Sequence, residues 1–159
     1  MLQMGMTGAD DLRALSKRIR TVTNPKQVRK DLTKGLREGA KPAAARVKAA
    51  ALALPDTPGN KSTGLRRKMA RATSVQVRTG GNQAGVAVRL SRARMGDQAA
   101  LPKVTNKGSW RHPVFGDRNT WVVQASRRGW FDEANRQSAK DVRASVKKVI
   151  DDIEKRLSH

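Results

Sequence analysis

The sequence contains no cysteine and no tyrosine, and acidic residues are scarce. Without cysteine the chain can form no disulfide, no thiolate metal site and no thiol nucleophile. Only 13 of its 159 residues are Asp or Glu, against 34 Lys or Arg, so its formal charge is +21. No apolar run approaches the roughly 18 residues of a membrane span, and we expect no membrane partner.

Large apolar side chains are also scarce. Leu, Ile, Val and Phe make up 30 of the 159 residues, about 19%, close to the ~20% below which highly charged chains tend to be disordered. We therefore expect a modest core, which a polyanion or neighbouring subunits would help to order.

The positive charge lies mainly upstream of the C-terminal segment. Residues 24–54 contain eight basic and two acidic residues, whereas residues 131–159 contain seven basic and six acidic residues. A strong positive charge favours polyanions in general, such as nucleic acid or an acidic protein surface, and does not choose among them.

Apolar spacing predicts three helical segments within a single domain spanning residues 1–159. The first lies in residues 1–23, where Leu12, Leu15 and Ile19 share one face. The second spans residues 24–54, because Asn24-Pro25 is a typical helix start. The third spans residues 130–157, with apolar residues again at helical spacing.

The second helix is long for a domain of this size. A straight helix over residues 25–54 would measure roughly 45 Å, whereas a compact domain of this length is about 40 Å across. Either Pro42 kinks this helix or one of its ends projects.

Between the second and third helices, alternating residues predict an antiparallel sheet over residues 72–125. It consists of a hairpin over 72–90, turning at Gly80-Gly81-Asn82, and a strand near 120–125. Residues 55–71 are predicted as a basic loop and residues 91–119 as a long loop. The expected fold class is α+β, with the helices packed on this small sheet.

Catalytic and metal-binding patterns are missing from the sequence. His112 precedes a proline and has no second ligand at metal-binding spacing, and phosphate-binding or nucleophile motifs are absent. Asp151, Asp152 and Glu154 are interpreted as a solvated helix face. We therefore expect no catalytic, cofactor or metal site. An enzyme acting on a polyanion, such as a nuclease, is the least supported hypothesis.

Two groups of residues are candidates for contacts with partners. The basic cluster Arg66, Arg67, Lys68 and Arg71 suits DNA or an acidic partner, and is equally well explained as a solvated helical turn.

All five aromatic residues lie within residues 110–131, interleaved with arginine. Such rings can stack on bases, anchor a protein interface or fill the core. We expect Trp121 and Phe131 in the core. The residues predicted for a subunit or partner interface are Trp110, Arg111, His112, Phe115, Arg127, Arg128 and Trp130.

The order of these features resembles that of a known family. A long helix ends at Leu54-Pro55, Thr63-Gly64-Leu65 and a hairpin follow, and residues 108–116 then read GSWRHPVFG before Gly129-Trp130-Phe131. Over residues 25–157 the chain resembles the tail-completion or neck proteins, which join head to tail in long-tailed double-stranded DNA bacteriophages, in the version found in phages of actinobacteria.

The resemblance implies a structural virion protein, made in the host cytoplasm, that forms a homo-oligomeric ring, commonly a hexamer. One face would bind the head-side connector or stopper protein, and the other the tail terminator or tail tube protein. Genomic double-stranded DNA would pass through the channel, and no residue would be catalytic. Two alternatives stay open: a tail terminator ring at the same junction, or a small basic protein that binds nucleic acid without sequence specificity.

Overall fold

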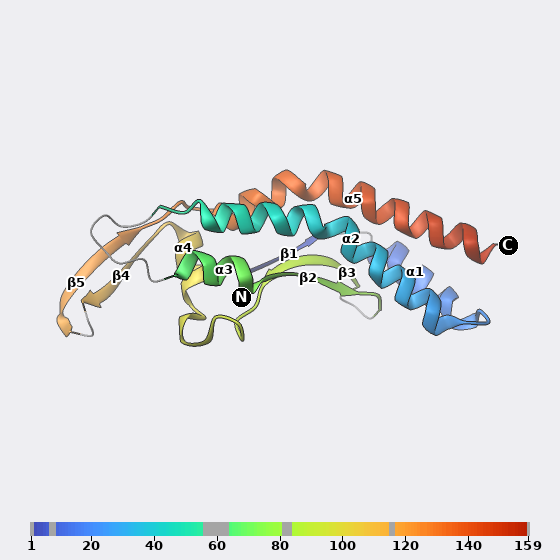
Figure 1. Ribbon diagram of the computed structural model, residues 1–159, viewed down its shortest axis with the longest axis horizontal. Helices are drawn as coiled ribbons and strands as arrows, with labels where there is room; N and C mark the ends of the chain where they lie inside the picture. Colours follow the sequence, from blue (N-terminus) through green and yellow to red (C-terminus); the bar gives the residue numbers. More distant parts are fainter. Residues whose placement is uncertain (1, 7–8, 56–63, 81–83, 115–116, 159) are drawn as a thin grey trace.

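The chain has an α+β fold of elongated shape. The computed structural model describes residues 2–6, 9–55, 64–80, 84–114 and 117–158. Two long helices lie over a three-stranded sheet and the shorter helices, and a two-stranded ribbon projects from one end of this body (Figure 1).

The two long helices, α2 (Pro25–Leu52) and α5 (Trp130–Leu157), confirm the predicted helical segments. They run antiparallel, side by side, and share the most extensive contact in the fold (Figure 1). The side chain of Asn24 caps α2 by accepting a hydrogen bond from the Gln27 N–H at 3.3 Å, and Pro25 occupies the first turn.

Helix α2 continues through Pro42 and changes direction near its middle (Figure 1). A proline inside a helix removes one backbone hydrogen bond and presses on the carbonyl one turn earlier, which is the expected cause of such a bend. The long helix is therefore accommodated by a bend and not by a break.

The predicted hairpin is confirmed as β2 (Thr73–Arg78) and β3 (Gly85–Leu90), paired antiparallel from Thr73↔Leu90 to Arg78↔Gly85. Residues 81–83 of its predicted turn lie outside the described residues. The third strand is β1 (Leu2–Met6), which pairs with the other edge of β3. The prediction that the strand near 120–125 joins this sheet is wrong, because that strand pairs with residues 109–114 in a separate two-stranded sheet.

The N-terminal segment is only partly helical. After β1, the helix α1 (Ala9–Arg18) and a short 3-10 turn, η1 (Ile19–Thr21), place the predicted apolar face on the core, with Leu12, Leu15 and Ile19 fully buried. The helix predicted within residues 1–23 lies at Ala9–Arg18, and residues 2–6 before it, for which no helical spacing was found, form a strand.

Both predicted loops contain regular structure. The basic loop includes α3 (Leu65–Ala72), whose sequence consists almost entirely of good helix formers. The long loop includes η2 (Gly96–Gln98), α4 (Leu101–Lys107) and the strand β4 (Ser109–Val114). Short elements such as these carry too few apolar residues to show a clear period.

The core lies between the long helices and the sheet, and alanine supplies much of the buried surface of α2. Phe131 is fully buried, as predicted, and its ring meets that of Trp130 edge to face at 5.8 Å. None of the helices in the described ranges combines the length and the apolar character needed to cross a lipid bilayer.

Candidate assembly arm and basic hollow

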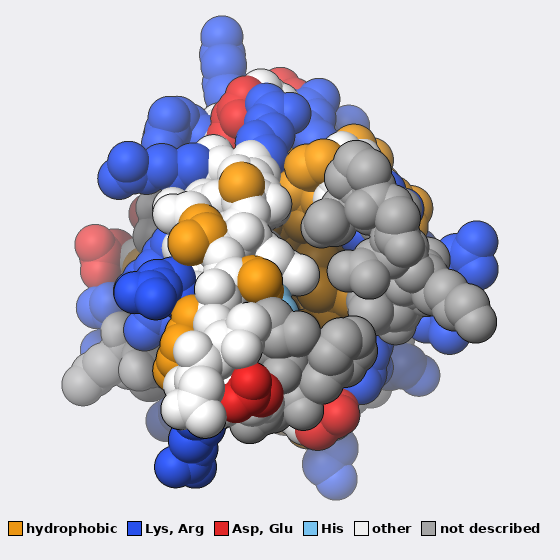
Figure 2. Space-filling view, turned by 90° about the vertical axis from the view of Figure 1, so that its left-hand side faces the viewer, with side chains coloured by type: hydrophobic (Ala, Val, Ile, Leu, Met, Phe, Trp, Pro, Cys, Tyr) orange, Lys and Arg blue, Asp and Glu red, His pale blue; other side chains and the backbone are white. Residues whose placement is uncertain are grey.

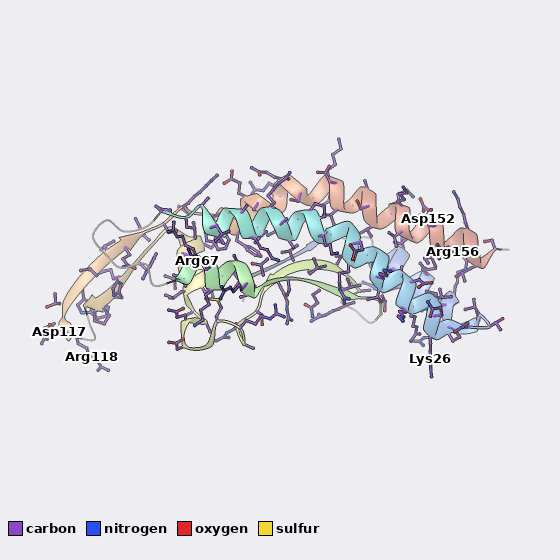
Figure 3. All side chains as sticks on the ribbon, viewed as in Figure 1. Lys26, Arg67, Asp117, Arg118, Asp152 and Arg156 are labelled. Atoms are coloured by element: carbon purple, nitrogen blue, oxygen red, sulfur yellow. The ribbon has the colours of Figure 1, made fainter. Side chains whose placement is uncertain are left out.

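Strands β4 and β5 (Asp117–Ala125) form an antiparallel ribbon, here called the arm, that projects beyond the body (Figures 1 and 3). Asp117 and Arg118 lie at its tip (Figure 3). No other described strand pairs with either edge of this ribbon. An isolated two-stranded ribbon is marginally stable in water, so further contacts would stabilise the arm.

The arm exposes large apolar side chains. Trp121 is 48% exposed, Val122 38% and Val123 68%, and the only other exposed large hydrophobic residue in the described part of the chain is Leu52. Trp121 was expected in the core, and this prediction is wrong. A strand with this composition normally packs against a second layer, but none of the described elements covers these three side chains.

The register of the arm assigns its side chains to two faces. Arg111 pairs with Val123 and Pro113 with Trp121, so these four residues share one face, here called the outer face. The guanidinium of Arg111 lies 5.7 Å from the centre of the Trp121 ring, a cation–π contact. Trp110 and His112 lie on the opposite face, where both are partly buried.

The arm carries little charge for so basic a chain. Its charged residues are Arg111, Asp117 and Arg118, out of the 17 positions from 109 to 125. Seen from the arm end, uncharged atoms and scattered hydrophobic side chains occupy the middle of the surface, and most Lys and Arg side chains lie around the rim (Figure 2). A centre depleted of charged residues inside a more polar rim is the usual anatomy of a protein interface.

The tip of the arm is held by local hydrogen bonds. The backbone N–H of Asn119 donates to Asp117 at 2.9 Å, and the Thr120 hydroxyl donates to it at 2.8 Å. These two donors, the backbone N–H first, hold the pKa of Asp117 below its usual value. Phe115, a predicted interface residue, lies outside the described residues.

The root of the arm is anchored by Asn106 at the end of α4. Its side chain donates to Asp132 at 2.8 Å and accepts from the Phe131 N–H at 2.9 Å, while its backbone carbonyl accepts from the Gly129 N–H at 2.8 Å. These bonds join the start of the arm to the start of α5. No local sequence pattern predicts these bonds, because they connect residues distant along the chain.

Trp130 belongs to this root. It is only 1% exposed, and its indole N–H donates to Thr105 at 3.2 Å. Its predicted role in a subunit interface is therefore wrong, because the first turn of α5 directs the ring into the core. Arg127 forms an ion pair with Glu133 at 2.7 Å, and Arg128 is exposed beside Gly108.

The predicted basic cluster lies on α3, where Arg67, Lys68 and Arg71 line a hollow of about 660 Å³. Arg94, from the turn after β3, completes this basic hollow. Arg94 was missed because it lies 23 residues after Arg71. Arg66 has a different position: it donates to the Leu54 carbonyl at 2.7 Å and so joins α3 to the segment that follows α2.

The cations of the hollow are only partly neutralised. Lys68 lies 3.3 Å from Asp97, and Arg94 donates to the backbone carbonyl of Arg71 at 3.3 Å. Among the described residues, Arg67 and Arg71 have no acidic partner within 4.0 Å. The hollow therefore holds an excess of positive charge before any ligand arrives.

No metal centre is assembled by the part of the chain that the structure describes, where three or more potential ligands nowhere converge. Asp151 and Glu154 instead contact Lys147 and Arg18, each at 3.6 Å. His112 approaches the carbonyl of Pro113 through Nδ1 at 3.0 Å.

We compared the chain with known protein families, curated proteins and solved structures. No family model, no curated protein and no solved structure matches this chain. The arm and the basic hollow are thus the two surfaces from which a function can be inferred.

Proposed function

We propose that the chain is a structural subunit of a bacteriophage neck, a head–tail joining protein that assembles into a homo-oligomeric ring. The observation that carries this proposal is the arm. Trp121, Val122 and Val123 expose consecutive large apolar side chains on a ribbon that projects beyond the other described elements. Burying such a surface against a neighbouring protein would stabilise both the arm and the assembly.

The arrangement of the subunit suits a closed ring. A cyclic ring uses head-to-tail contacts, so each subunit needs two different patches at separate places. The arm projects from one end of an elongated body, while the paired helices α2 and α5 extend to the other (Figure 1). An arm reaching from one subunit onto the next would supply one patch of each such contact.

The charge distribution favours a protein partner for the arm over nucleic acid. Surfaces that bind DNA are strongly positive because they neutralise phosphates. The arm has two arginines and one aspartate, and Arg111 already contacts the Trp121 ring. The aromatic and valine side chains instead resemble the buried anchors of protein interfaces.

The proposal is tested in a phage that encodes this chain. Particles assembled without it should contain DNA-filled heads and separate tails, because the joining layer is missing. Supplying the wild-type chain should restore joined particles. Normal head–tail joining in its absence would contradict the proposal, as would its absence from the mass spectrum of purified virions.

A further inference from the structure

We infer that the basic hollow of Arg67, Lys68, Arg71 and Arg94 binds phosphate groups of double-stranded DNA without reading its sequence. The inference goes beyond the proposed assembly role and does not depend on ring formation, because the hollow is built within one subunit. The arm, in contrast, needs a second protein.

The hollow is assembled from two separate segments of the chain. Arg67 and Arg71 lie one turn apart on α3, so their side chains project from the same side of the helix. Arg94 is positioned by its hydrogen bond to the Arg71 carbonyl at 3.3 Å. This contact places a third guanidinium beside the other two. The third group comes from a different segment of the chain, so the hollow is more than one basic face of α3.

The lining of the hollow identifies the class of ligand. Besides Gly64, the described residues that line it are all cationic, and none of them is one of the apolar or aromatic side chains that form the centre of a protein interface. A ligand held there is held by charge and hydrogen bonds. Guanidinium groups match phosphate oxygens with paired N–H donors, and a duplex presents phosphates at regular spacing on both strands.

The hollow is also distinct from the general basic surface. Mutual repulsion of uncompensated cations disfavours their clustering unless an anion offsets it. Arg67 lies at the end of the body from which the arm projects, whereas Lys26 lies at the opposite end (Figure 3). Basic residues on the long helices can therefore be replaced in equal number, to compare their effect on DNA binding with that of the hollow residues.

The test measures binding of the full-length chain to a short fluorescent DNA duplex of arbitrary sequence. Fluorescence anisotropy gives the affinity at each of a series of salt concentrations. The R67Q/R71Q/R94Q variant should bind at least tenfold more weakly near 100 mM salt. It should also lower the slope of log affinity against log salt by about 2–3, since each phosphate contact contributes about 0.9. R67K/R71K/R94K keeps the charge but loses the paired guanidinium donors, so it should keep the salt slope of the wild type and bind more tightly than the glutamine variant.

The matched control, K26Q/R143Q/K148Q, removes the same charge from exposed residues of α2 and α5. It should lower the slope by less than one. Equal losses in both triple variants would overturn the inference, because binding would then reflect net charge alone. Binding to poly-glutamate but not to the duplex would also overturn it, in favour of an acidic protein partner. Since the hollow variant keeps an intact arm, loss of DNA binding and loss of assembly are separable.

Discussion

At the scale of single residues, the direction of the arm depends on Gly108. It links α4 to β4 with a φ of +99°, and a Cβ added there would lie 2.8 Å from the Cβ of Arg128. Only glycine adopts such a backbone readily. The small residue lets the two chain segments at the root approach closely, and the Ser126 N–H donates to the Gly108 carbonyl at 2.7 Å.

Replacing Gly108 by alanine should destabilise the subunit by about 2–4 kcal/mol, because backbone strain and overpacking add. Gly129→Ala is the matched control. Gly129 has a φ of +69° with nothing within 4 Å of an added Cβ, so about 1–2 kcal/mol is expected from the backbone alone. Urea unfolding followed by tryptophan fluorescence measures both, and equal losses would show that the contact with Arg128 is unimportant.

Residue chemistry predicted some of these positions and missed others. The Asn24 cap and the buried Phe131 follow from local pattern and apolar character. Trp121 was predicted in the core and Trp130 at an interface, whereas Trp121 is exposed and Trp130 is buried. A tryptophan gains by burial in a core and by burial in an interface alike, so its identity does not reveal which of the two covers it.

At the scale of elements, the pairing of α2 with α5 depends on two glycines of α2. Cβ atoms added at Gly35 and Gly39 would lie 2.8 Å from Val149 Cγ1 and 2.9 Å from Ser145 Cβ. Glycine inside a helix costs about 1 kcal/mol relative to alanine, and here close packing of the helices offsets that cost. Arg46 adds a hydrogen bond across the pair to Ser138 at 3.2 Å.

This packing can be measured by a double-mutant cycle. Gly39→Ala should destabilise the chain despite its better helix propensity, because the new Cβ meets Ser145. Ser145→Gly removes the obstructing atom, so the double variant should be more stable than the sum of the single effects by about 1 kcal/mol or more. Additive effects within about 0.5 kcal/mol would contradict close contact at this position.

The elements differ in how far sequence alone could define them. The long helices and the β2–β3 hairpin have sustained periodicity and were predicted. The arm was not, because strand alternation shows that residues 120–125 are extended and cannot show which sheet they join. The strand β1 pairs with a strand about 80 residues away, and such non-local pairing leaves no local signal.

At the scale of the whole molecule, two surfaces of opposite chemistry lie on one chain. The outer face of the arm exposes the apolar side chains of Trp121 and Val123 beside a single cation, Arg111, whereas the described lining of the hollow beside Arg67 is almost entirely cationic. In the proposed ring, the first surface would face a neighbouring protein and the second the nucleic acid. The net charge alone could not have separated these two roles.

Solution mass tests the central claim, assembly through the arm, most directly. Sedimentation equilibrium of the full-length chain over a range of concentrations should show a homo-oligomer. Trp121→Ser/Val123→Ser should give monomers with unchanged thermal unfolding of the body. Leu52→Ser, which removes an equally exposed apolar side chain from α2, should assemble like the wild type. Two results would contradict the account. One is a wild-type chain that stays monomeric at about 100 times a micromolar dissociation constant. The other is an arm variant that still assembles.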